Sequence, residues 1–309
     1  FAQYRALGKK VREMGIGNSN PDKAVEPSDL VRLGYDQPAA EWIVRLLDRD
    51  AQLDRYLQRA AAYGIVPVTQ WSPDYPVRML QNLGDLCPPV LFCFGDCTLL
   101  RQPGVSLVGS RKLLPSGRQF ASRVGQLAAQ ESLTLISGSA VGADSTAQNT
   151  CLQAGGTVLS FLAESLLQHA AHPIPDGMLL CSETGFTLPF SPQRAISRNR
   201  LIHAMGLRTF VAQTSAGTGG TFRGTVENLS HGWSMQTVLR VHACSACAAP
   251  YRFRSTGFRP YAAPMPVSPH CRPLMHCDGR SKAPLTGSFF LLVFGFLLIR
   301  RNPHDIIPR

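Results

Sequence analysis

The sequence contains no apolar run long enough to cross a membrane. An abrupt apolar stretch from Ser288 to Ile299 is too short, because a membrane-spanning helix needs about 20 such residues. The segment from Phe1 to Lys10 lacks the apolar centre of a signal peptide. We therefore expect no membrane partner and a cytoplasmic location. Because the chain starts at Phe1 and not at Met, we also expect it to be a piece of a longer protein.

The sequence also lacks a disulfide framework, a metal motif and a catalytic cluster. The nine cysteines are an odd number without a secretion signal, which favours free thiols in a reducing compartment. Cys244 and Cys247 form a Cys-x-x-Cys pair, but Cys271 and Cys277 are spaced too widely to complete a zinc knuckle. Up to Trp233 there is no paired carboxylate, Ser–His–Asp arrangement or metal motif. We therefore expect no metal, no cofactor and no enzyme activity.

Acidic residues become scarce toward the end of the chain, where no Glu follows Glu227. The formal net charge is +11, and from Met235 onward ten Lys/Arg against two Asp/Glu supply +8 of it. Such an excess favours a polyanionic partner. After Trp233, Pro and Arg become dense and amphipathic periodicity disappears. We interpret residues 234–309 as an irregular basic tail, either out of frame or disordered.

Before this tail, residues 1–75 carry the signals of short helices. The segment from Pro38 to Leu47 places Ile43 and Leu46 at helical spacing, and Gly64 is typical of a helix end. We expect a small helical N-terminal domain here.

Residues 76–233 alternate strand and helix patterns. We predict strands at 105–108, 134–136, 157–161, 178–181 and 209–212, and helices at 117–131, 144–154, 164–169, 193–205 and 217–229. This alternation predicts an α/β domain with a parallel sheet and right-handed crossovers. Ligands of such sheets bind at the carboxyl ends of the strands.

Small-residue turns follow three of these strands. They are Gly109-Ser-Arg111, the segment from Ser137 to Asp144, and Gly217-Thr-Gly-Gly-Thr221. Turns of this kind leave backbone N–H groups open, and helix N-termini favour anions. Each alone is also compatible with an ordinary strand-to-helix connection, but three at one edge of a sheet favour a ligand site.

Cationic side chains accompany the turns. Ser110 can hydrogen-bond a phosphate, and Arg111, next to Lys112, can grip one bidentately. Pairing of Arg111 with a carboxylate at the sheet edge is the equally open alternative. Arg194 and Arg198 share a helix face without an acidic neighbour in sequence. They form either a solvated face or, beside the three turns, an anion site.

Together these motifs resemble the DNA-processing protein A family (DprA, also called Smf). The matching segments are Asp74-Tyr-Pro76 with Pro89-Val-Leu-Phe92, Val108-Gly-Ser-Arg-Lys112, Ser137 to Asp144, Ala154-Gly-Gly156, Ser182-Glu183 and Phe190 to Ile202. The resemblance implies a Rossmann-like parallel sheet with helices on both faces that binds single-stranded DNA. Family members pass incoming DNA to the RecA recombinase during transformation, and they form homodimers.

The resemblance also implies a set of DNA-binding residues. In the family the Gly-Ser-Arg turn, the Ser-Gly turn and the Arg-Asn-Arg helix line the DNA pocket. The predicted DNA-binding residues are Gly109, Ser110, Arg111, Lys112, Ser137, Gly138, Arg194, Arg198, Asn199 and Arg200. Phe186, Phe190 and Phe222 are candidates for stacking on bases or, as is commoner for Phe, for the core.

The sequence departs from the family in three respects. Val141 stands where the family usually has Arg, the segment from Gly217 to Thr221 replaces a Ser-Gly-Ser motif, and no winged-helix tail is recognisable. RecA loading is therefore less directly implied than DNA binding.

An enzyme is the alternative. The Gly-Thr-Gly-Gly-Thr loop also resembles the phosphate loop of nucleotide phosphoribohydrolases, with Glu227 acting on a ribosyl bond and Asp144 holding a ribose. Glu227, however, lies further beyond the loop than the acid of that family does. Glu183 follows a strand end and is either catalytic or, more simply, part of a turn or helix cap.

Overall fold

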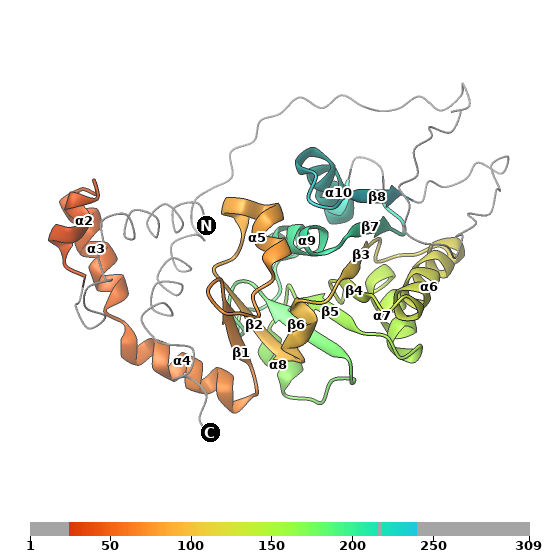
Figure 1. Ribbon diagram of the computed structural model, residues 1–309, viewed down its shortest axis with the longest axis horizontal. Coiled ribbons are helices and arrows are strands. Elements are labelled where there is room, and N and C mark those ends of the chain that lie inside the picture. The colour runs from red at the N-terminus through yellow and green to blue at the C-terminus, as the bar shows by residue number, and fades with distance from the viewer. Residues whose placement is uncertain (1–24, 216–217, 240–309) are drawn as a thin grey trace. The chain divides into compact units, whose positions relative to one another are not determined.

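The computed structural model describes residues 25–215 and 218–239 (Figure 1). Most of the predicted tail, including Cys244, Cys247 and the apolar stretch from Ser288, lies outside these residues, as does Gly217. Among the helices that are described, none has the length and apolar character needed to cross a membrane.

Three helices come first: α2 (Pro27–Arg32), α3 (Gln37–Leu47) and α4 (Asp50–Ala62). The start of α3 is fixed by Asp36, whose side chain accepts the Ala39 N–H, and by a proline in the first turn. Helices α2 and α3 share a small apolar core made by Leu30, Leu33, Ala40, Ile43 and Leu47. The periodicity of the sequence therefore predicted α3 correctly.

The described residues also form a sheet of eight strands. These are β1 (Val66–Thr69), β2 (Val90–Gly95), β3 (Gly104–Val108), β4 (Thr134–Ser137), β5 (Val158–Phe161), β6 (Met178–Ser182), β7 (Arg208–Val211) and β8 (Gln236–Leu239). Their order is β1-β2-β6-β5-β4-β3-β7-β8. The strands from β3 to β8 are parallel, which confirms the predicted α/β fold with its parallel sheet.

The edges of the sheet differ from the sequence-based expectation. Strand β2 pairs antiparallel with β6, and β1 pairs antiparallel with β2. Strand β1 precedes the boundary that we predicted at residue 75, and β8 follows the one predicted at residue 233. Both are four-residue strands at the two ends of the sheet.

The remaining helices cover both faces of the sheet. They are α5 (Val77–Leu83), α6 (Pro115–Gln130), α7 (Ala143–Gln153), α8 (Leu166–Ala170), α9 (Pro192–Met205) and α10 (Gly219–His231), with short 3-10 turns η1 (Gly84–Leu86) and η2 (Cys97–Leu100). On β3, Leu107 packs among residues of α6 and α7, whereas the next residue, Val108, packs among residues of α5 and α9. Because successive strand residues face opposite sides, the two helix pairs lie on opposite faces.

Helix α4 packs on the sheet. Leu53 and Leu57 share a core with Phe92 of β2 and with Phe186. The Tyr56 hydroxyl accepts the Phe186 N–H at 3.1 Å, and the two rings are 4.3 Å apart. The contacts of α4 therefore join it to the α/β domain rather than to the first two helices alone.

The strand order defines a switch point at the centre of the sheet. From β3 the chain crosses to β4 through α6, and it later returns to the other side of β3 through α9 and β7. The loops after β3 and β7 therefore leave in opposite directions. A crevice at the carboxyl ends of two such strands is the usual ligand site of this topology.

Candidate functional site

Close backbone contacts hold together the loops at the switch point. The Ser110 N–H donates to the Gln213 carbonyl after β7 at 2.8 Å, and the Ser110 carbonyl accepts the Ala143 N–H at 3.1 Å. Gly109 has no room for a side chain, because a Cβ there would overlap that of Ala143 and crowd that of Ala212. Two of the predicted small-residue turns, after β3 and β4, thus meet at one edge of the sheet.

The start of α10 lies beside the same turn. The Thr221 hydroxyl donates to the Gly109 carbonyl at 3.0 Å, and the Asn199 side-chain amide donates to the Gly220 carbonyl at 3.4 Å. The first N–H groups of a helix have no partner within the helix and favour anions. The described part of the third predicted turn, from residue 218, therefore also belongs to this edge.

Asp144 organises the turn after β4. One of its oxygens, Oδ2, accepts the N–H groups of Gly138 at 3.0 Å and Ala140 at 3.4 Å. Below it, the Gln148 amide donates to the Ser137 hydroxyl at 2.5 Å. The hydrogen bonds to Gly138 and Ser137 are buried and the one to Ala140 is partly buried, so the turn is held firmly. Asp144 is occupied in holding the backbone, which is a structural role that the sequence did not predict.

Arg198 lies beneath this turn and is only 6% exposed. Its Nη1 is 4.0 Å from Asp144 Oδ2, an ion pair too long to be a hydrogen bond. Within the described residues, Nε and Nη1 of Arg198 have no hydrogen-bond partner. Burial lowers the pKa of Arg198, and burial also raises the pKa of Asp144, while each charge opposes the shift of the other. The site thus contains a buried positive charge with unused donors.

The other two predicted arginines of α9 are engaged by protein partners. Arg200 pairs with Glu183 at 2.5 Å, and the Ser197 hydroxyl donates to the same carboxylate at 3.1 Å. Arg194 donates to the carbonyls of Leu188 and Pro189, both at 2.6 Å. These side chains fix the loop after β6. Of the two arginines for which the sequence left a solvated helix face open, Arg198 is buried and Arg194 is half-buried.

The exposed cations of the site are Arg111 and Lys112, which follow β3. The Lys112 backbone is fixed by the Ser110 hydroxyl, which accepts its N–H at 3.1 Å, and by the Gln213 side chain, which donates to its carbonyl at 3.1 Å. The positive charge of Arg111 acts on both Asp144 and Arg198. Arg111 and Arg198 are therefore neighbours at one edge of the sheet.

Two of the residues that support this site, Asp144 and Gln213, were not predicted from the sequence to do so. Asp144 was considered as a ribose-binding group and Gln213 was not considered at all, whereas Glu183 was considered either as a catalytic group or as part of a turn or helix cap. Each lies just beyond a strand end or, like Asp144, at the start of the following helix. Their positions after strand ends, at the carboxyl edge of the sheet, were the sequence signal from which a supporting role could have been predicted.

The geometry does not favour the phosphoribohydrolase alternative. Glu227 lies eight residues after Gly219, the first residue of α10, and is therefore about 12 Å further along the helix axis. Asp144, the proposed ribose holder, is buried under the turn. Among the described residues no cluster of His, Cys, Asp and Glu is suited to a metal ion. The Cys-x-x-Cys pair of the tail lies outside them.

Comparison with known proteins supports the DNA-processing resemblance. Residues 67–236, more than half of the chain, match the family described as DNA recombination-mediator protein A. The protein Smf of Synechocystis sp. is 31% identical over 103 residues, which cover 32% of this chain and 25% of that protein. The match therefore spans about a quarter of the length of this relative.

A solved structure shows the same fold. DNA processing protein A from Streptococcus pneumoniae superposes with a TM-score of 0.60 at 22% identity, covering 74% of this chain and 79% of that one. DNA processing protein A from Helicobacter pylori, whose structure is described for its single-stranded DNA binding mode, gives a TM-score of 0.43 at 21% identity over 56% of this chain and 90% of that one.

Proposed function

Because the chain belongs to the DNA recombination-mediator protein A family, we propose that it binds single-stranded DNA across the crevice at the carboxyl ends of β3, β4 and β7. The observation that carries this proposal is the meeting of exposed Arg111 and Lys112 with buried Arg198 at one set of turns. Cations that follow a phosphate chain supply most of the affinity for such a strand. Catalysis plays no part in this proposal.

The ten predicted residues divide by exposure. Arg111 and Lys112 are exposed and are the residues proposed to contact phosphates, and Ser110 orients the loop that carries them. Gly109, Ser137, Gly138 and Asn199 shape the backbone around the crevice. Arg198 adds positive potential from its buried position beneath the turn after β4. Arg194 and Arg200 hold the loop after β6. Only the first group is expected to lose direct DNA contacts when mutated.

The family membership supports a further step. We propose that the bound strand is handed to the RecA recombinase in the cytoplasm during DNA uptake, and that the protein acts as a homodimer. The description of the family as a recombination mediator supports a recombinase as the recipient. Addition of the protein to RecA and coated single-stranded DNA should shorten the lag before ATP hydrolysis, and size-exclusion chromatography with light scattering should give twice the chain mass.

The DNA proposal is tested by fluorescence anisotropy with labelled single-stranded and duplex oligonucleotides at two salt concentrations. Arg111→Ala and Lys112→Ala should each weaken single-strand binding and flatten its salt dependence by roughly 0.7 in the log–log slope. Arg123→Ala is the matched control, because Arg123 is exposed on α6 and its side chain donates a hydrogen bond to Gln126 of the same helix. Unchanged affinity in both site variants, with intact folding, contradicts the proposal.

A further inference from the structure

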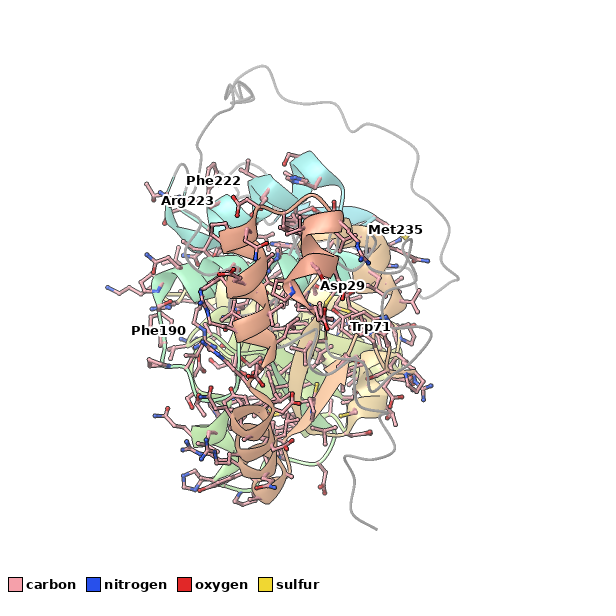
Figure 2. All side chains as sticks on the ribbon, turned by 90° about the vertical axis from the view of Figure 1, so that its left-hand side faces the viewer. Asp29, Trp71, Phe190, Phe222, Arg223 and Met235 are labelled. Carbon is pink, nitrogen blue, oxygen red and sulfur yellow. The ribbon has the colours of Figure 1, made fainter. Side chains whose placement is uncertain are left out.

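Two phenylalanines of one loop have opposite environments. Phe186 is fully buried and packs against Tyr56 and Phe92, whereas Phe190, four residues later, is 47% exposed. In Figure 2, Phe190 and Phe222 project on the same side of the view. Of the two residues in this loop that the sequence offered for base stacking, only Phe190 is exposed to solvent.

The backbone that carries Phe190 is held in place. Arg194 donates to the carbonyls of Leu188 and Pro189 at 2.6 Å and, through Nε, to the Thr184 hydroxyl at 2.9 Å. On the other side, the Ser191 hydroxyl accepts the Arg194 N–H at 3.1 Å and caps α9. An exposed ring on an anchored backbone loses little conformational freedom when a partner stacks on it.

Arg111 lies over this ring. Its guanidinium carbon is 5.5 Å from the centre of the Phe190 ring. Among the described residues, no carboxylate lies within ion-pair distance of Arg111. A cation–π contact at an exposed site is one of the weaker polar interactions, so it is readily exchanged for a charged partner.

We propose that Phe190 is the base-stacking platform of the site and that Arg111 caps it in the free protein. The inference rests on the proposed function. When a single strand binds, Arg111 moves from the ring to a phosphate, and the uncovered ring accepts the base attached to that strand. A duplex keeps its bases stacked on one another and cannot offer one to the ring. The Arg111–Phe190 pair therefore contributes to the preference for single strands.

The test compares two oligonucleotides of equal length and charge, oligothymidine and an abasic strand. For the wild type, oligothymidine should bind more tightly than the abasic strand. Phe190→Ala should weaken oligothymidine binding about ten-fold, in line with measured losses of aromatic stacking. The same variant should leave abasic binding unchanged, since Arg111 and the phosphates remain. Phe190→Tyr keeps the ring and should retain the wild-type difference.

The outcomes separate this inference from the DNA proposal. If Phe190→Ala affects both strands equally, or neither, the platform is excluded while DNA binding stands. If the wild type binds neither strand, both proposals fail. Arg111→Ala provides a second check, because it should weaken both strands through the lost phosphate contact but keep the advantage of oligothymidine. Loss of that advantage in Arg111→Ala contradicts the assignment of stacking to Phe190.

Discussion

At the scale of single residues, the site depends on a missing side chain. A Cβ on Gly138 would overlap the guanidinium of Arg198, so only glycine allows this arginine to lie directly beneath the turn. The close approach brings the buried positive charge next to the backbone that Asp144 holds. The requirement for glycine therefore arises from packing against Arg198 and not from the conformation of the turn alone.

Gly138→Ala is accordingly expected to lower the free energy of unfolding by roughly 1–3 kcal/mol, the usual range for overpacking. Single-strand binding should weaken as well, because the turn must move. Gly220→Ala is the control in the same site, since its Cβ would lie 3.8 Å from Ile196 Cγ1 and 4.0 Å from Asn199 Nδ2. Urea unfolding of both variants gives the comparison. A Gly138→Ala protein as stable as the wild type contradicts this account.

The individual residues of the site differ in how well their positions could be predicted from the sequence. The position of Arg111 and Lys112 could be predicted, because they follow a strand closely and the structure places both, exposed, at the carboxyl edge of the sheet. Their contact with DNA stays a prediction. The burial of Arg198 and the partial burial of Arg200 were not predicted, because their carboxylate partners are distant in sequence. Asp144 and Glu183 approach α9 only after the sheet has formed, and local patterns carry no information about such pairing.

At the scale of elements, the alternation of strand and helix patterns was sufficient to predict the parallel core from β3 to β7. Buried parallel strands are short apolar runs, and the helices between them are amphipathic, so each leaves a local signal. The direction of β2 leaves no such signal. Whether a strand runs parallel or antiparallel is decided by the path of the chain, here through α5 and η1.

The contact between α9 and α10 contains a buried histidine. His203 is fully buried; its Nδ1 is 3.2 Å from the Thr209 hydroxyl, and its Nε2 has no partner in the described part of the chain. Gly224 of α10 lies next to it, since a Cβ there would be 3.3 Å from Asn199 Cβ and 3.4 Å from His203 Nε2. Burial lowers the pKa of His203 from 6.5 to about 4.

This lowered pKa predicts a loss of stability in mild acid. Between pH 6.5 and pH 4 the unfolded chain binds a proton at His203 that the folded protein excludes, so stability falls as the pH falls through this window. The loss at pH 4.5 relative to pH 7 should be about 2–3 kcal/mol. His203→Gln cannot titrate, so urea unfolding of the variant should show a smaller pH dependence by this amount. Equal pH dependence in the two proteins is the contradicting result.

At the scale of the whole molecule, the charge is divided unequally between the described residues and the rest. Residues 240–309 carry ten Lys/Arg against two Asp/Glu and therefore +8 of the net +11. Such a segment is attracted to single-stranded and to double-stranded nucleic acids, because both carry negatively charged phosphates. The crevice, by contrast, is expected to distinguish single-stranded from duplex DNA, because stacking on Phe190 requires a base that is not already stacked in a duplex.

A chain ending at residue 239 separates these contributions. It should bind all oligonucleotides more weakly and with a flatter salt dependence, because the charge that attracts both forms has been removed. Its affinity ratio of single-stranded to duplex DNA should be maintained or increased, because all residues assigned to the crevice precede residue 240. Arg111→Ala in the shortened chain should then remove most of the remaining single-strand affinity. If the shortened chain binds both forms equally, the preference arises in residues 240–309, and the crevice is not the site of discrimination.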